Sequence, residues 1–493
     1  MDNSPVPDGI KKKSRLPAII AVVIVIVVIA AGVSIIELQH HSTTTNKQQT
    51  LVIEVGSGSM TQQYLSMVAK NFEKANPNVT VQITSEGYSD LLTSEESALK
   101  GASSTPNIMM YYASQAPALG SYLYNLPTSS TGGNGVIDLS NQIAGNMFSG
   151  GYRIAPNGTI LSTIGVPIHT VIGYMLVYQK SIFGNTTLQT AFYDKYHFSF
   201  NPRTYQNWTA VQDAASFINT STSFNGTNNN YALLFPDHAA HSIIDGFYNL
   251  AYPYLSSDPS TGVPANSSPN YWTYFGNKSG HYVVSYNNSA GVQALEMYKN
   301  LTQYEPSVSV SPVGYSEQLT YYETGHYAMG IAWSSFFPDY SNSSQSKVAG
   351  NYNVSLLPGG YTGYSPTLLG VNPHSPNLTL AVDFLNFATS SAQYGLGITD
   401  FSFLPGSANG LQVAESDPGF GWVSSFVNYS ATIHLNPGYA AVVGQVSPLF
   451  STLIPDFNTQ VLDYLEGTTT APAALNSAAL QWTQTLTNDN IVL

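Results

Sequence analysis

The sequence predicts an α/β fold built from parallel strands, because strand and helix patterns alternate through its N-terminal third. Residues 51–55 favour a β-strand and run into a Gly/Ser turn, after which residues 60–76 carry apolar side chains at helical spacing. Residues 78–84 alternate as a second strand, and the helical run 89–103 leads to an apolar strand at 107–112. Two strand–helix–strand units in series imply a parallel sheet with right-handed crossovers.

The length of the chain indicates more than one domain. At 493 residues the chain exceeds what one hydrophobic core usually holds, so we expect two domains or lobes. The hydrophobic content of 43% is enough for a sizeable core. Cysteine is absent, which excludes disulfides, thiolate metal sites and cysteine nucleophiles.

Charge is scarce. Charged residues make up 9% of the chain, against about 25% in typical globular proteins. Beyond residue 36 there are 11 basic and 26 acidic side chains, so the clustered positive charge that nucleic-acid binding needs is missing. Ion pairs fail where carboxylates are protonated, whereas neutral polar side chains keep a surface insensitive to pH. We therefore expect an acid-adapted protein; the alternative is that glycans supply the solubility.

An uncharged apolar run at 16–36 predicts one transmembrane helix, because about 20 such residues cross the hydrocarbon core. The basic leader 1–15 places the N-terminus in the cytoplasm and the remainder of the chain outside the cell, with residues 37–49 as a flexible tether. The expected localisation is the cell membrane, crossed once. A secretory signal cleaved near the small residues 30–32 is the alternative.

Asn-x-Ser/Thr sequons are frequent beyond the apolar run, which favours a glycosylated, surface-exposed protein. They lie at Asn78, Asn157, Asn185, Asn207, Asn219, Asn225, Asn266, Asn277, Asn287, Asn300, Asn342, Asn353, Asn377 and Asn428. A chain so rich in Asn, Ser and Thr also forms sequons by chance, so their occupancy cannot be read from the sequence.

The rest of the chain continues with strands and helices in a less regular order. Residues 157–184 show a strand, a break at Pro167 and a second strand. Further strands are expected at 326–334, 354–360 and 367–371. Helices are expected at 204–218, 290–304, 316–325 and 377–389, and in most of 446–493. Loops are expected in the Asn/Ser/Gly/Pro-rich stretches 219–230 and 255–290.

The order of these segments resembles the extracellular sugar-binding proteins of ABC transporters, in particular the maltose-binding type. The resemblance is carried by LVIEVGSG, VAKNFEKANPNVTVQIT, SALKGASSTPNIMMYYA, ALGSYLYNL, GVPIHTVIGYMLVYQKSIFG, PRTYQNWTAVQDAASFI, AGVQALEMYKNL, ETGHYAMGIAWSSF, VSLLPGGYTGYSPTLLGV and SPNLTLAVDFLNFATS. No single motif is specific, but the ordered set extends over roughly residues 50–480. Archaeal members often carry a leader that keeps the apolar helix as an anchor, and KKKSR loosely resembles such a leader.

The resemblance implies a two-lobed, periplasmic-binding-protein-like α/β fold with a hinge between the lobes. Lobe I would comprise 50–167 and 331–371, and lobe II 168–330 and 372–493. The implied function is capture of a sugar or oligosaccharide in the cleft between the lobes and its delivery to an ABC permease. The implied partners are the permease's transmembrane subunits and their cytoplasmic ATPase, and no cofactor is implied for this chain.

Candidate binding residues follow the strands, because ligands of such α/β sheets bind beyond the carboxyl ends of the strands. The hydroxyls of Ser57 and Ser59, in the loop after the first strand, suit a sugar. The aromatic candidates, whose flat rings suit the apolar face of a pyranose, are Tyr88, Tyr111, Tyr112, Trp333 and Tyr364. Strand alternation lets only one of Tyr111 and Tyr112 face a ligand, and for each aromatic the alternative is core packing.

Five further polar candidates complete the set: Ser114, Gln115, His169, Asp237 and His238. Ser114 and Gln115 stand where the maltose-binding type has charged groups, and His169 stands where that type has an acid. The identity of the sugar therefore does not carry over from the resemblance.

Other functions find less support in the sequence. Asp237, His238 and His241 could share a helix face, but no further ligand converges on them, so we expect no metal site. No carboxylate pair with glycosidase spacing and no GxSxG elbow is visible, so we expect no enzymatic activity. The alternatives that stay open are a binding protein for oligopeptides or another solute, a secreted glycosidase and a surface structural protein.

Overall fold

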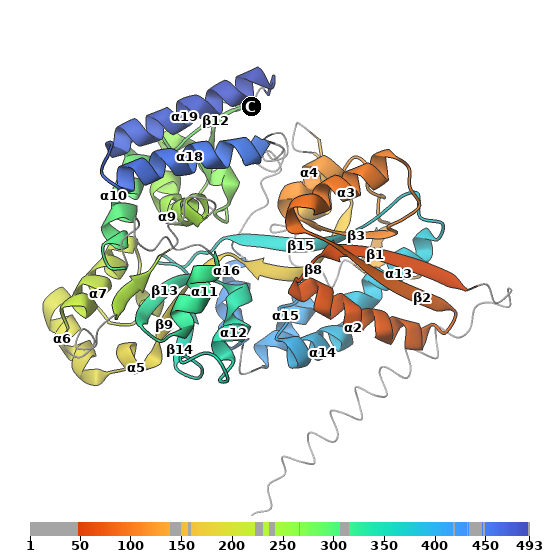
Figure 1. Cartoon of the computed structure of the whole chain (residues 1–493), viewed down its shortest axis with the longest axis horizontal. Coiled ribbons are helices and arrows are strands. Elements are labelled where there is room, and N and C mark those ends of the chain that lie inside the picture. The colour runs from red at the N-terminus through yellow and green to blue at the C-terminus, as the bar shows by residue number, and fades with distance from the viewer. Residues whose placement is uncertain are drawn as a thin grey trace, which may run out of the picture.

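The computed structural model describes residues 48–491, apart from 139–148, 156–158, 222–229, 236–241, 266, 306–314, 418–419, 431, 433–445 and 447–448. Figure 1 shows two α/β lobes connected through strands β8 (Gly165–Ile172) and β15 (Tyr364–Val371). Within the described part of the chain, no helix has both the length and the apolar character needed to cross a membrane. The apolar run at 16–36 lies outside the described residues.

A five-stranded sheet forms the first lobe, in the order β2-β1-β3-β15-β8. Its other strands are β1 (Gln49–Gly56), β2 (Val79–Glu86) and β3 (Ile108–Tyr112). β1 pairs in parallel with β2 and β3, which confirms the predicted parallel units, whereas β15 runs antiparallel to β3 and β8. Helix α3 (Tyr88–Lys100) covers one face, and α2 (Met60–Ala75) with α13 (Leu378–Ala388) covers the other (Figure 1).

A four-stranded sheet forms the second lobe, in the order β10-β13-β9-β14. Its strands are β9 (Tyr174–Gln179), β10 (Tyr231–Leu234), β13 (Tyr327–Trp333) and β14 (Tyr352–Ser355). β10 and β13 are parallel, and β9 is antiparallel to β13 and β14. The helices that pack against this sheet or extend the lobe are α5 (Lys180–Phe183), α6 (Thr186–Tyr196), α7 (Trp208–Thr220), α9 (Ser242–Ser257), α10 (Ser289–Thr302), α11 (Tyr315–Glu323), α12 (Phe337–Ser341), α16 (Val423–Ser430), α18 (Phe450–Leu465) and α19 (Ala471–Asn488).

Smaller elements complete the chain. Three are short helices, namely α4 (Ala116–Leu119), α14 (Ser391–Phe401) and α15 (Ala408–Glu415). Short two-stranded sheets are formed by β4 (Thr128–Ser129) with β5 (Ile137–Asp138), β6 (Tyr152–Ile154) with β7 (Ile160–Thr163), and β11 (Phe275–Lys278) with β12 (His281–Val284). The β11–β12 hairpin lies in the stretch 255–290 that we expected to be a loop, and Ser279 and Gly280 turn it with positive φ.

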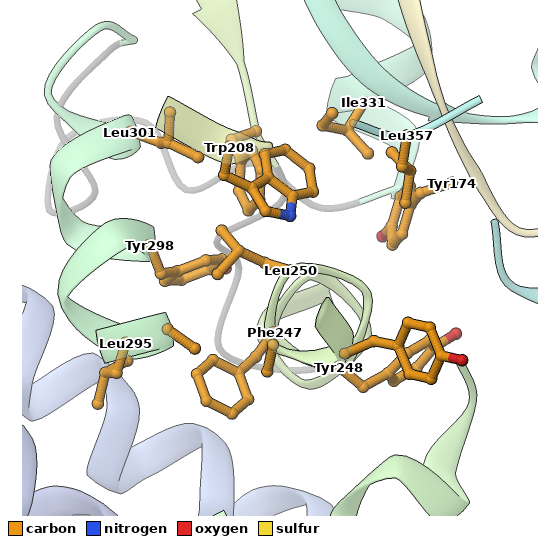
Figure 2. Close-up of a cluster of buried hydrophobic side chains, with 14 of the residues drawn as sticks. Tyr174, Trp208, Phe247, Tyr248, Leu250, Leu295, Tyr298, Leu301, Ile331 and Leu357 are labelled. Atoms are coloured by element: carbon orange, nitrogen blue, oxygen red, sulfur yellow. The ribbon is translucent and has the colours of Figure 1, made fainter. Parts of the chain in front are cut away.

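The second lobe has the larger aromatic core (Figure 2). Trp208 of α7, Phe247 of α9, Tyr298 of α10 and Tyr174 of β9 belong to one buried cluster on the same face of the four-stranded sheet. The Trp208 indole N–H donates to the Tyr361 hydroxyl over 3.0 Å, so the polar edge of the ring is satisfied inside the core. This core explains how a chain without cysteine holds a large lobe together.

Neutral side chains cap seven of the α-helices that the structure describes. Asn185, Asn207, Asn288 and Asn377 accept backbone N–H groups at the starts of α6, α7, α10 and α13. Ser and Thr do the same for α2, α15 and α19. An asparagine or hydroxyl cap satisfies the orphan N–H groups of the first turn without a charge, so these caps do not depend on the ionisation of a carboxylate.

The strand pairing differs from the expected division into lobes. Residues 168–172 belong to β8 of the first sheet, and residues 331–333 and 352–355 belong to the second sheet. Helix α13 packs in the core of the first lobe, through Phe384 and Leu385. Strands that are apolar on both faces do not reveal from sequence which sheet they join.

Pro167 does not break the strand as expected. It lies in β8, the edge strand of the first sheet, opposite a register shift between Thr367 and Leu368. An edge strand with a bulge tolerates the missing N–H of proline. The chain changes sheets further on, at Gly173 between β8 and β9.

The two crossings between the sheets touch at a pair of glycines. The Gly173 N–H donates to the Gly363 carbonyl over 2.7 Å, where residues 356–363 lead from β14 to β15. A Cβ on Gly173 would lie 3.0 Å from three backbone atoms of Gly363. Contacts this short with backbone atoms cannot be relieved by moving a side chain, so both strands would have to separate.

We predict that Gly173→Ala destabilises the protein by about 1–3 kcal/mol, the usual cost of overpacking. Urea unfolding measures the loss. The matched control is Gly395→Ala, because Gly395 lies inside α14 and its Cβ would meet only Val413 at 4.0 Å. That variant should be as stable as the wild type or more stable, since alanine is the better helix former. Equal stabilities for wild type and Gly173→Ala would contradict the close approach of the crossings.

Candidate functional site

The carboxyl ends of β1, β2 and β3 lie next to one another at the edge of the first sheet. Gly56 pairs with Glu86 in register, and the Ser57 N–H donates to the Glu86 carbonyl over 2.7 Å. A Cβ on Gly56 would lie 3.4 Å from the Tyr112 hydroxyl, so this hydroxyl lies next to the glycine. The structure therefore brings together three of the predicted loops, the ones that follow Gly56, Glu86 and Tyr112.

The two serines of the first loop have different roles. Ser57 is exposed. Ser59 is the N-cap of α2: its hydroxyl accepts from the Gln62 N–H over 3.1 Å and donates to the Gly56 carbonyl over 2.7 Å. The Gly58 N–H donates to the Gln62 side chain over 2.8 Å. The Ser59 hydroxyl therefore forms its hydrogen bonds within the loop and the first turn of α2. Ser57 is the serine whose side chain faces solvent.

Tyr111 and Tyr112 point to opposite faces of β3, as strand alternation requires. Tyr111 is fully buried, and its hydroxyl donates to the Gly150 carbonyl over 2.9 Å. Burial raises the pKa of this hydroxyl. Tyr111 is therefore a core residue that no solute reaches in this structure, a correction to its place among the candidates, and half-buried Tyr112 is the member of the pair at the strand end.

The turn after β3 is held by its own polar groups. Gln115 accepts the Tyr112 N–H through Oε1 over 2.9 Å. Ser114 lies between them in the 3-10 turn Ala113–Gln115.

The two remaining aromatic candidates lie at the starts of elements: Tyr88 is the first residue of α3, and Tyr364 is the first residue of β15. These backbones all reach the junction of the two sheets.

Trp333 is the aromatic candidate from the second lobe. It ends β13 opposite Tyr174 of β9 and is half-buried. The two rings are in contact, with centroids 5.0 Å apart and planes at 47°. Tyr174 is itself fully buried in the core of the second lobe beside Leu357 and Ile331 (Figure 2), and its carbonyl accepts from the Thr362 hydroxyl over 2.8 Å. One side of the Trp333 ring thus rests on a fixed support.

His169 lies inside the first lobe instead of at its surface, which corrects its place among the candidates. The imidazole is buried, stacks on Phe403 with centroids 4.5 Å apart, and places Nδ1 3.3 Å from the Thr61 hydroxyl. Burial lowers the pKa of His169 to about 4 because the charged form is desolvated. A neutral His169 therefore ties β8 to α2 and to the segment after α14.

Asp237 and His238 lie outside the described residues, so the structure does not place them. Within the residues that it does describe, no group of three or more His, Asp or Glu side chains could hold a metal ion. The described polar side chains at the carboxyl ends of β1, β2 and β3 include exposed Ser57, half-buried Tyr112 and half-buried Glu86. This set can donate and accept hydrogen bonds from a neutral solute.

Sequence reasoning missed the residues that support the junction. Gly173 and Gly363 let the crossings touch, and Tyr174 supports Trp333. A signal for them was present, because a Gly-Tyr dipeptide occurs at each crossing: Gly173 precedes Tyr174, and Gly363 precedes Tyr364. In each case the glycine allows close backbone approach and an aromatic residue follows at the start of a strand.

Solved structures share this fold. A maltose-bound protein of T. maritima aligns with a TM-score of 0.61 at 16% identity, over 89% of this chain and 100% of that one. The GacH receptor of Streptomyces glaucescens, solved unliganded and with acarbose, aligns at 0.62 and 17% over 90% and 99%. A solute-binding protein of Agrobacterium vitis with bound D-mannitol aligns at 0.59 and 16% over 90% and 99%. None of the curated proteins matches the chain in sequence.

The chain also matches a protein family at the level of sequence. A family model described as "Bacterial extracellular solute-binding protein" matches residues 67–419. The matched stretch runs from α2 to the segment after α15, and so includes both sheets and both crossings apart from β1. This chain belongs to the bacterial extracellular solute-binding protein family.

Proposed function

We propose that this protein is the extracellular substrate-binding subunit of an ABC importer and captures a sugar or oligosaccharide between its two lobes. The observation that carries the proposal is Trp333, which is half-buried at the end of β13 and packs against Tyr174, next to the crossing between the sheets. An aromatic ring supported in this way suits a sugar ring, which has apolar faces and a polar rim. The structures of similar fold that hold maltose, acarbose and D-mannitol agree with this class of solute.

The proposed mechanism is a population shift. A solute that contacts both lobes binds the closed arrangement more tightly than the open one, so it favours closure by the difference in affinity. The glycine pair Gly173 and Gly363, where the crossings touch, would be the pivot. The transmembrane subunits of a permease would then recognise the closed form, and their cytoplasmic ATPase would drive import.

We also propose the setting in which the protein works. The apolar run at 16–36 would anchor it in the membrane as a single helix, with residues 1–15 inside the cell and the two lobes outside. The loose resemblance of KKKSR to an archaeal leader and the scarcity of charge support an archaeal, acid-adapted protein. The neutral helix caps support the acid-adapted part of this proposal, because they keep their hydrogen bonds when carboxylates are protonated.

We predict that a sugar or oligosaccharide stabilises the protein and that Trp333→Ala weakens its binding at least tenfold, about 1.4 kcal/mol. A thermal-shift screen followed by calorimetry tests this, since a ligand at 100 times its Kd adds about 2.7 kcal/mol of stability. The control is Tyr193→Ala, which removes an exposed aromatic ring on α6, in the second lobe. A peptide that binds where every sugar fails would keep the solute-binding role and overturn the substrate class.

We predict glycans at Asn185 and Asn207 in protein isolated from its native host. Both residues are exposed and cap a helix through Oδ1, and a glycan joins Nδ2, so modification and capping are compatible. The Asn377 Nδ2 already donates to Gln49 over 2.6 Å, so we expect less modification there. Glycopeptide mass spectrometry reads all three sites.

The matched control for Asn185 is Thr187→Ala, which destroys the sequon but leaves Asn185 to accept the backbone N–H groups of α6. The glycan should disappear while the thermal stability of the unglycosylated protein stays unchanged. Unmodified Asn185 and Asn207 in the native protein, beside a modified Asn377, would contradict the accessibility argument.

A further inference from the structure

Two carboxyl groups are buried together between α3 and β1 of the first lobe. Glu95 of α3 is fully buried, and Glu54 of β1 is 6% exposed. The Ser94 hydroxyl donates to Glu54 Oε1 over 3.0 Å. Glu54 Oε2 and both carboxyl oxygens of Glu95 are buried and have no hydrogen-bond partner among the described residues. Such groups call for an explanation, because an unpartnered buried polar atom costs free energy.

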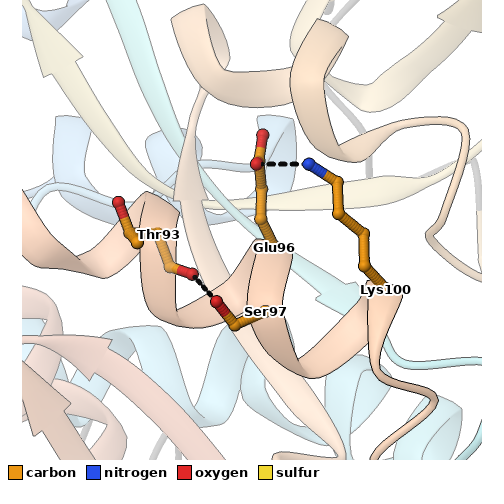
Figure 3. Close-up of polar contacts among 4 residues, drawn as sticks. All are labelled: Thr93, Glu96, Ser97 and Lys100. Carbon is orange, nitrogen blue, oxygen red and sulfur yellow. Dashed lines mark hydrogen bonds and ion pairs between the residues drawn. The ribbon is translucent and has the colours of Figure 1, made fainter.

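The groups around this pair do not supply a positive charge. On β3, Tyr111 faces Glu95 and uses its hydroxyl on Gly150. At the end of β2, Glu86 adds a negative charge near Glu54. After α4, Tyr122 faces Lys100 across 5.6 Å. On α3 itself Asp90 is exposed, and Lys100 forms an ion pair of 2.6 Å with Glu96, which is partly exposed (Figure 3).

Burial therefore sets the protonation state of the pair. Desolvation, and to a smaller extent the neighbouring Glu54, raise the pKa of the Glu95 carboxyl to about 9. Burial also raises the pKa of Glu54, with the Ser94 hydrogen bond acting in the opposite direction. An ionised carboxylate without a partner is far more costly to bury than the neutral acid. The packed arrangement of α3 on β1 is thus the arrangement in which Glu95 is protonated.

We propose that Glu95, packed beside Glu54, forms a proton-dependent latch, in which the protonated Glu95 carboxyl lets α3 dock on β1 and the loss of its proton loosens the contact. The latch is independent of the proposed solute. Because α3 begins at Tyr88, beside the end of β2, the latch also fixes one wall of the junction between the lobes. An extracellular protein with this latch is most firmly folded in acid, where proteins usually lose stability.

The direction of the pH dependence follows from linkage. The folded state keeps the Glu95 proton up to about pH 9, whereas the unfolded chain releases it near the ordinary glutamate pKa of 4.5. Stability from this group is therefore complete below about pH 4.5 and is lost as the pH rises toward 9. His169 acts oppositely below about pH 6.5, because the unfolded chain protonates this imidazole before the folded protein does. Above pH 6.5 the opposing contribution of His169 fades, so it weakens the slope only at the lower end of the range.

The test is urea unfolding of the whole protein at several pH values between about 6.5 and 8. For the wild type we expect the equilibrium constant for folding to fall about tenfold per pH unit, since one proton is released on unfolding. In Glu95→Gln this dependence should be lost. The matched control is Glu96→Gln, the same substitution at the next residue of the helix, where the carboxylate is partly exposed and paired with Lys100; it should keep the wild-type slope (Figure 3).

Glu95→Leu is the second variant, in case the amide introduced by Glu95→Gln strains the site, and it should also flatten the slope. A wild-type slope that persists in both Glu95 variants would overturn the latch. A carboxyl titration by NMR that places Glu95 near its ordinary value in the folded protein would overturn it as well. Loss of the slope in Glu96→Gln would show that net charge, and not burial of Glu95, causes the pH dependence.

Discussion

The contact between Gly173 and Gly363 is the constraint on which the rest of the molecule depends. Here the chain leaves the first sheet for the second and later returns, and the two crossings share a hydrogen bond of 2.7 Å. The absence of a Cβ at Gly173 allows backbones to meet that would otherwise be kept apart. Each Gly is followed by a Tyr that begins a strand. The position of Trp333 follows, because Tyr174 holds it from the same crossing.

A second theme is that neutral groups carry the polar interactions of the fold. One ion pair, Lys100 with Glu96, is present among the residues that the structure describes. Asn, Ser and Thr cap the helices, and Tyr and Trp hydrogen bonds lie inside the cores. Desolvation raises the pKa of several acids, namely Glu54, Glu95, Asp213, Glu323, Asp339, Asp383 and Asp456. These acids favour the folded state when protonated, the reverse of a fold held by salt bridges.

The spacing of apolar residues in the sequence correctly predicted the parallel strand–helix units of the first lobe. The alternation in 78–84 and the helical spacing in 60–76 are local properties of the sequence. The spacing could not assign β13 and β14 to the second sheet, because strand pairing is decided by residues distant in sequence. It also misjudged Pro167, whose tolerance depends on the edge position of β8. At the site, the local sequence pattern identified the strand ends. It could not show that Tyr111 and His169 are buried, because burial depends on packing against residues distant in sequence.

Two buried titratable residues, His169 and Glu95, show how the first lobe combines opposite responses to acid. Neutral His169 stabilises the fold less as the pH falls below about 6.5, and protonated Glu95 stabilises it less as the pH rises. Both are buried in the same lobe, next to the elements that reach the junction, α2 for His169 and α3 for Glu95. The two responses occur in different pH ranges, because burial raises the pKa of the Glu95 carboxyl and lowers the pKa of the His169 imidazole. Burial therefore makes both groups neutral in the folded lobe, and each favours the folded state only where its neutral form is kept.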